Sequence, residues 1–132
     1  MEALERFEPH AELYFQIGCC QEAMKEYDRA ADFFSNLLKQ DPFDEEVLYR
    51  IGCCHAGAGR LKKAVQAFYR AINMDDQREE FHLALAEALE KLGQRARAAL
   101  HYATAHSLAP DSEVYALQYA RFLLFSLQCR MA

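Results

Sequence analysis

The residues of this sequence best suited to metal or redox chemistry are its cysteines. Cysteine thiolates bind metal ions, and thiols also exchange electrons. Four of the five cysteines stand in adjacent pairs, Cys19-Cys20 and Cys53-Cys54. On a helix, adjacent side chains point about 100° apart, so the two members of a pair cannot readily chelate one ion. We therefore interpret them as packing residues, with Cys20 and Cys54 in small buried gaps and Cys19 and Cys53 nearer a binding surface.

The histidines offer no better arrangement for catalysis or metal binding. They are scattered over different predicted helices, without a His-Glu-x-x-His motif or a nucleophile beside them. They are His10, His55, His82, His101 and His106. We therefore expect no catalytic residue, no metal and no cofactor, and a protein that is not an enzyme.

Composition favours a helical protein with a globular core. Apolar residues make up 52% of the 132 residues and charged residues 27%, while glycine and proline number only five and three. The net charge of −5 argues against nucleic-acid binding, which needs a basic face, and suits a partner that carries lysine or arginine.

Nothing in the sequence indicates secretion or a membrane span. The first six residues lack a basic leader followed by an apolar run. The most apolar stretch, 114–127, is too short for a bilayer and is interrupted by Gln118 and Arg121. The odd number of cysteines, mostly in adjacent pairs, suits reduced thiols. We predict a cytoplasmic protein.

A ladder of similar residues recurs at a spacing of 34. That shift places Ile17-Gly18-Cys19-Cys20 on Ile51-Gly52-Cys53-Cys54, with Leu85-Ala86 at the third place. It also aligns Ala30, Ala64 and Ala98, and one turn later Phe34, Phe68 and Tyr102. We predict one domain over residues 1–132 with repeats at about 11–44, 45–78 and 79–112 and a terminal helix at about 113–128. Each repeat contains two helices, predicted at 12–24 and 27–40, 46–57 and 61–74, and 80–92 and 95–108.

Small and bulky residues alternate where the two helices of a repeat must cross. Gly18, Gly52 and Ala86 let the second helix approach the first, and the aromatic residues fill the space between hairpins. One hairpin cannot bury its apolar face alone, so the repeats must stack into a single cooperative unit.

This pattern resembles the tetratricopeptide repeat, which has small, aromatic, alanine and proline positions at fixed offsets within each copy. The resemblance implies an all-α fold, a right-handed superhelix of three helix-turn-helix repeats with a C-terminal capping helix. Three departures affect local geometry, not the fold: Lys25 stands where the family favours glycine, Leu37 where it favours a small residue, and Asp76 where it favours proline.

In that family the first helix of each repeat lines a concave wall where extended peptides bind. The positions that face this groove in the family correspond here to three sets of residues, one from each repeat. They are Glu12, Phe15, Cys19 and Glu22 in the first, Glu46, Tyr49, Cys53 and Ala56 in the second, and Glu80, Leu83, Glu87 and Glu90 in the third. Phe15, Tyr49 and Leu83 form an apolar stripe, and the leading glutamates form a parallel acidic ladder. We predict a groove for an extended or short helical segment with apolar anchors and nearby basic residues. Alternatively, the glutamates only complement the helix dipoles.

Two narrower comparisons within the family point in opposite directions. The carboxylate clamp for heat-shock chaperone tails needs lysine, asparagine and arginine where this chain has Phe15, Cys19, Arg50, Glu80 and Ala84, so that role is disfavoured. By contrast, the segments 41–61, 74–75 and 81–87 resemble class II chaperones of bacterial type III secretion, small acidic three-repeat proteins that hold translocator subunits before export. Their longer N-terminal extension, used for dimerisation, is mostly missing, since only residues 1–8 precede Pro9.

The terminal helix carries apolar residues around most of its circumference, whereas a capping helix is expected to have a polar outer face. Deep packing on the third hairpin is one explanation. The one we favour is a surface for self-association or a partner, formed by Tyr115, Tyr119, Phe122 and Phe125. The sequence therefore predicts a peptide-binding scaffold or chaperone, with a structural adaptor working through its convex face or terminal helix as the alternative.

Overall fold

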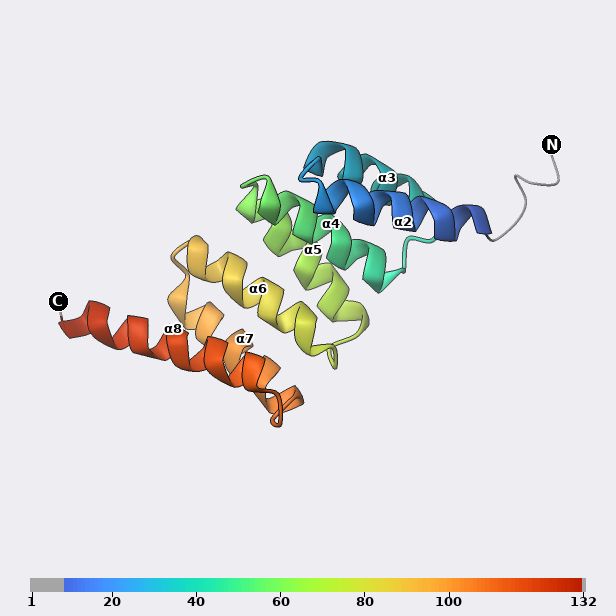
Figure 1. Ribbon diagram of the computed structural model, residues 1–132. Coiled ribbons are helices and arrows are strands. Elements are labelled where there is room, and N and C mark those ends of the chain that lie inside the picture. The colour runs from blue at the N-terminus through green and yellow to red at the C-terminus, as the bar shows by residue number, and fades with distance from the viewer. Residues whose placement is uncertain (1–8, 132) are drawn as a thin grey trace, which may run out of the picture.

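The computed structural model describes residues 9–131, with side chains from 11 to 130, and contains seven α-helices and no strand within that range (Figure 1). The helices are α2 (Pro9–Ala23), α3 (Tyr27–Gln40), α4 (Glu45–Gly57), α5 (Leu61–Met74), α6 (Glu79–Lys91), α7 (Arg95–Leu108) and α8 (Glu113–Met131). The expectations about a secretory leader and about the extension ahead of Pro9 lie outside the described residues.

The helix boundaries agree closely with the predicted ones. The largest differences are at the two ends of the chain, where α2 begins at Pro9 and α8 continues to Met131. Proline is compatible with the first turn of a helix because its missing N–H has no partner there anyway. No glycine or proline follows Pro110 to stop α8.

The helices stack as three hairpins followed by α8, which confirms the predicted all-α superhelical architecture. Helices α2, α4, α6 and α8 lie on one side of the stack, and α3, α5 and α7 on the other (Figure 1). Along the first side, α4 contacts both α2 and α6. We call this side the A face, because it is formed by the first helix of each repeat.

The predicted close approach is present within the first two hairpins. A Cβ atom added to Gly52 would lie 2.5 Å from the ring of Phe68, and one added to Gly18 would lie 2.7 Å from the ring of Phe34. The aromatic rings therefore press directly against the backbone of the first helix.

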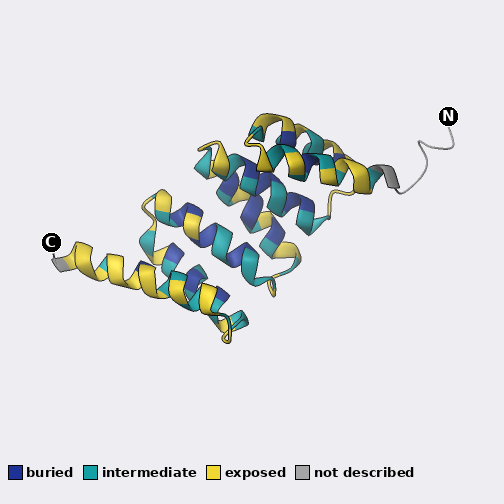
Figure 2. Cartoon of the chain, viewed as in Figure 1, coloured by how far each residue is buried: buried dark blue, intermediate teal, exposed yellow. Residues whose placement is uncertain are grey.

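The core lies between the two sides of the stack, and α8 is the most exposed helix of the C-terminal half (Figure 2). The largest fully buried side chains of the core come from every hairpin and include Phe34, Phe68, Phe81 and Tyr102. Within residues 9–131, no helix is long and apolar enough to cross a membrane.

The hairpin turns share one conformation although their sequences differ. Gly59 and Gly93 have φ values of +85° and +83°, and Lys25, at the same place in the first repeat, has φ of 64°. The departure from glycine seen in the sequence is therefore accommodated without changing the turn.

Candidate functional site

The predicted groove residues come from α2, α4 and α6, and none of them is fully buried. Glu12 and Glu87 are exposed, and the other seven of the principal nine are half-buried. Those seven are Phe15, Cys19, Glu46, Tyr49, Cys53, Glu80 and Leu83. Half-buried side chains of this kind are anchored by the core while part of their surface stays accessible to a ligand.

The apolar stripe is held in place by aromatic contacts beneath it. The ring of Tyr49 stacks on Phe81 with 4.9 Å between centroids and also contacts Phe68. Phe15 meets Phe34 edge to face at 5.6 Å. Leu83 packs against the same core cluster as Tyr49. Because these partners are themselves buried, we expect the side chains of the stripe to need little ordering when a ligand binds.

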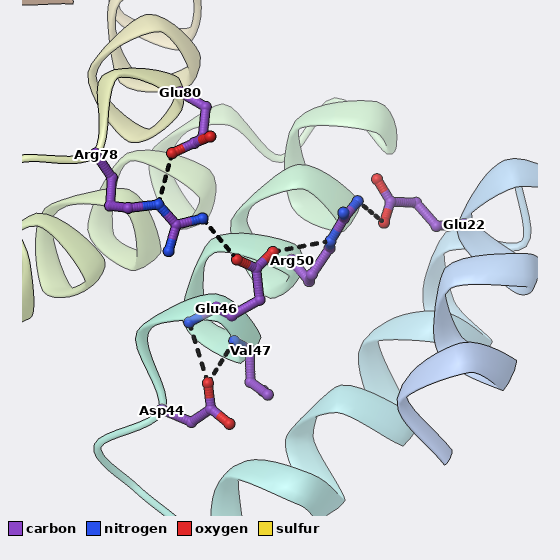
Figure 3. A network of polar contacts seen from close by, with 7 residues as sticks. All are labelled: Glu22, Asp44, Glu46, Val47, Arg50, Arg78 and Glu80. Atoms are coloured by element: carbon purple, nitrogen blue, oxygen red, sulfur yellow. Dashed lines mark hydrogen bonds and ion pairs between the residues drawn. The ribbon is translucent and has the colours of Figure 1, made fainter. Parts of the chain in front are cut away.

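The acidic ladder is largely paired within the chain (Figure 3). Arg78 donates from Nη2 to Glu46 at 2.9 Å and from Nε to Glu80 at 2.7 Å. Arg50 lies 3.4 Å from Glu46 and 3.6 Å from Glu22. Three carboxylates and two guanidinium groups thus form one network across α2, α4 and α6 that keeps a single net negative charge.

The two arginines of this network were not among the predicted site residues. Arg50 follows Glu46 by four residues on α4, a spacing at which opposite charges meet on a helix, and this signal was available in the sequence. Arg78 stands one repeat after Asp44, whose side chain caps α4 by accepting from the N–H groups of Glu46 and Val47. Arg78 caps nothing and instead joins α4 to α6, a contact that only the stacking of the repeats creates.

The thiols behave as packing groups, with one correction. Burial raises the pKa of both Cys53 and Cys54 to about 12, so neither forms an appreciable amount of thiolate at neutral pH. Cys54 is fully buried, as predicted, but Cys20 is exposed. Cys54 is packed in the core cluster shared by α3 and α4, whereas no described helix precedes α2 to cover Cys20. Among the described residues, no three His, Cys, Asp or Glu side chains converge as a metal site.

A second polar cluster joins α6 to α8. Arg121 makes a two-pronged contact with the carboxylate of Glu90, at 2.9 and 3.3 Å, and also donates to the Tyr102 hydroxyl at 3.0 Å. That hydroxyl donates to Glu90 at 2.6 Å. Each neighbouring pair of helices on the A face is therefore joined by an arginine–carboxylate contact: Arg50–Glu22, Arg78–Glu46 and Arg121–Glu90.

Two hollows include predicted groove residues and lie at opposite ends of the stack. One, of about 400 Å³, is lined by Glu12 and Phe15 together with the end of α3 and the start of α4. The other, of about 480 Å³, is lined by Glu87, Glu90 and residues of α7 and α8. The structure thus brings Glu12 and Phe15 into one hollow and places Glu87 in another.

The predicted surface on α8 needs correction. Phe122 is only 2% exposed and packs on Tyr102 with 4.8 Å between centroids, so it belongs to the core. Tyr115 and Tyr119 are half-buried, and Phe125 is exposed with the Arg95 guanidinium 4.8 Å from its ring centroid. The most exposed apolar side chains of α8 are others: Val114, Leu117, Leu123, Leu124 and Leu127. The prediction is thus wrong for Phe122, because α8 is apolar nearly all round and its sequence does not show which side packs on α7.

Comparison with known protein families identifies the class of this chain. The family described as tetratricopeptide repeat matches residues 3–77, more than half of the sequence. The chain belongs to the tetratricopeptide repeat family. No curated protein matches the sequence significantly.

Solved structures share the fold at low sequence identity. The type III secretion chaperone SycD of Yersinia enterocolitica, in complex with a peptide of the translocator YopD, is 20% identical, with a TM-score of 0.82 and coverage of 96% of this chain and 98% of that one. PcrH in complex with the chaperone binding region of PopD is 23% identical, with a TM-score of 0.81 and 96% coverage of both chains. The first tetratricopeptide repeat domain of Spaghetti, bound to an HSP90 peptide, is 14% identical, with a TM-score of 0.82 and coverage of 89% of this chain and 93% of that one.

Proposed function

We propose that this chain is a peptide-binding scaffold or chaperone that holds an extended or short helical segment on its A face. The observation that carries the proposal is the stripe of Phe15, Tyr49 and Leu83, half-buried on the first helices of three successive repeats. Buried aromatic rings brace Phe15 and Tyr49, and Leu83 packs against the core cluster. Such a stripe offers apolar contact area without the cost of ordering it on binding.

The charged residues refine which ligand the groove would accept. Glu46 and Glu80 share Arg78, which neutralises part of their charge. They therefore attract a basic ligand less strongly than the sequence alone indicated. Glu87 is exposed and makes no direct ion pair within the described residues. Partial burial raises the pKa of its carboxyl group, and the nearby cations Lys91 and Arg121 oppose that rise. We therefore assign the preference for a basic residue chiefly to Glu87, beside the third anchor, Leu83.

Peptide selection tests the groove directly. A random dodecapeptide library displayed on phage is panned on the full chain, and the strongest binder is measured by fluorescence polarisation. Tyr49→Ala should lower its affinity about tenfold or more, because truncating a central aromatic anchor removes a large share of binding energy. Glu87→Lys should weaken binding of peptides that carry lysine or arginine.

Matched controls separate loss of binding from loss of folding. Circular dichroism and thermal melting check that each variant is folded, which matters for Tyr49 because its ring packs on Phe81. Lys62→Glu reverses a charge on the exposed surface of α5 and should leave affinity unchanged. Folded Tyr49→Ala and Glu87→Lys variants that bind as tightly as the natural chain would contradict the proposal.

Within this function, we propose the narrower role of a type III secretion translocator chaperone. It is supported by the fold shared with SycD, solved with a peptide of the translocator YopD, and with PcrH, solved with the chaperone binding region of PopD. The sequence resemblance around residues 41–61 also supports it. Co-expression with the translocator subunits of the host should give a soluble complex on gel filtration. Subunits that stay insoluble or elute separately would contradict this role and leave peptide binding itself intact.

A second candidate, a structural adaptor, is favoured by one observation. A hollow of about 660 Å³ lies between α7 and α8, lined by Ala96, Ala99, Leu123, Leu127 and others, with Arg95 and Arg130 also among its lining residues. Removing α8 is no clean test, because Phe122 belongs to the core. Leu123→Glu instead alters only this surface, and an assembly that it disrupts while Tyr49→Ala does not would favour the adaptor.

A further inference from the structure

The repeat period continues beyond the third repeat into α8. Tyr119-Ala120 stands one period after Leu85-Ala86, where the earlier repeats have isoleucine and glycine. Burial follows the same period at one position: Phe122 lies one period after Ala88 and two periods after Cys54, and all three are buried at 2% exposure or less. It does not follow at Ala120, which is exposed although Gly52 and Ala86 are buried. Helix α8 thus keeps the sequence register of the first helix of a repeat.

This correspondence identifies which side chains of α8 share the face of the groove. Leu117 continues the series Phe15, Tyr49 and Leu83, whose members are each one period apart. Val114 continues the series of Glu12, and Leu124 the series of Glu22. These three α8 residues are among the most exposed large apolar residues of the described chain, at 66% for Leu117 and 59% for each of the others.

The orientation of α8 agrees with this assignment. Arg121 lies on the same face, between Leu117 and Leu124 in the sequence, and its guanidinium contacts Glu90, a predicted groove residue of α6. In Figure 1, α8 lies on the same side of the stack as α2, α4 and α6, and Figure 2 shows it largely exposed there. Leu123 points elsewhere, since it lines the hollow between α7 and α8.

We infer that the peptide groove runs onto α8, where Leu117 forms a fourth apolar anchor flanked by Val114 and Leu124. This inference rests on the proposed function of the A face. The ladder of glutamates ends at Glu80, because its fourth place is Val114. The end of the groove on α8 thus selects an apolar part of the ligand, and Glu87 selects a basic residue just before it.

Helix spacing then describes the ligand. Packed helices lie about 8–10 Å apart, and an extended chain advances about 3.3–3.6 Å per residue. Successive anchors should therefore meet about every third residue of the ligand, and four anchors need a segment of about ten residues. The predicted ligand is an extended peptide with four apolar residues at this spacing and a lysine or arginine between the third and the fourth.

Two leucines on one helix provide a matched test. The dodecapeptide library described above is panned on the full chain, and the selected peptide is measured against Leu117→Ala and Leu123→Ala. Both substitutions remove the same atoms from an exposed position, so neither should affect folding greatly. We expect Leu117→Ala to weaken binding about five- to tenfold and Leu123→Ala to change it less than twofold.

A shortened peptide tests whether Leu117 contacts the fourth apolar position of the ligand. Removing the end of the peptide that includes the fourth apolar position should weaken binding to the natural chain, yet cause no further loss with Leu117→Ala. If Tyr49→Ala weakens binding but Leu117→Ala does not, or if Leu123→Ala is the damaging change, the inference is overturned and the groove stands. If no peptide is selected, or Tyr49→Ala has no effect, the groove itself is contradicted and the inference with it.

Discussion

At the scale of single residues, the least expected feature is a pair of stacked histidines, His82 and His101. Their Nδ1 atoms lie 3.1 Å apart, and the Nε2 of His82 is 3.0 Å from the carbonyl oxygen of Asp76. A carbonyl can only accept, so His82 donates there and its Nδ1 accepts from the Nδ1–H of His101. Burial, the neighbouring His82 and Arg97 together lower the pKa of His101 to about 4.

This depressed pKa predicts a loss of stability in mild acid. In the unfolded chain His101 has its ordinary pKa of 6.5, so between pH 6.5 and about 4 the unfolded state binds the proton more readily. The contribution that neutral, buried His101 makes to the free energy of unfolding is therefore present above pH 6.5 and is lost as the pH falls toward 4. The free energy of unfolding is measured with urea at neutral pH and at about pH 5. It should fall less between these two pH values for His101→Gln than for the natural chain. Equal losses would contradict this account.

At the scale of elements, the hairpin turns show what the repeat requires of its residues. All three turns place one residue in the left-handed region, which glycine adopts freely and a residue with a Cβ does not. In the first turn that residue is Lys25, and the stack holds it there by packing α2 against α3. The first hairpin thus carries backbone strain that the other two avoid.

Relieving this strain should stabilise the protein. Lys25→Gly should raise the free energy of unfolding by about 0.5–1 kcal/mol, less than the full cost of the left-handed conformation because glycine is also freer in the unfolded chain. The control is Ala58→Gly in the second turn, where φ is −84° and glycine should stabilise nothing. Chemical denaturation measures both variants. A destabilised Lys25→Gly variant would show that the lysine side chain contributes more than the turn costs.

At the scale of the whole molecule, α8 is both the last layer of the core and an exposed surface. Phe122 packs on Tyr102 at the end of the stack, whereas Leu124, which follows it closely on the same helix, is largely exposed. Arginine–carboxylate contacts then join all four helices of the A face in sequence. Each such contact is partly exposed and contributes about 1 kcal/mol or less, so the buried aromatic rings must supply most of the cohesion.

Truncating each of these two residues should separate the two roles of α8. Phe122→Ala should lower the free energy of unfolding by about 3–5 kcal/mol, because it empties a buried site. Leu124→Ala should change it by less than about 0.5 kcal/mol, because an exposed side chain loses little on truncation. Urea denaturation of both variants gives the comparison. Similar values for the two would mean that α8 does not complete the core.

Much of the fold and part of the candidate site could be predicted from the sequence. Local signals suffice for the helices, since Gly59, Gly93 and Pro110 stop them and small residues such as Gly52 mark the crossings. The repeat period then places Phe15, Tyr49 and Leu83 on successive first helices, because it repeats the same helical position.

Other features needed the tertiary structure because they depend on residues far apart in the chain or on the ends of the stack. Arg78 pairs with Glu46 across 32 residues, which turned a predicted acidic ladder into a mostly balanced network. Cys20 is exposed, whereas Cys54, one period later, is buried against residues of α3. Phe122 and Leu117 are both large apolar residues of α8, and only the packing of α8 on α7 decided that one is core and the other is surface. The sequence by itself thus determined the repeats and their common face, and the stacking decided which residues of that face remain free to bind.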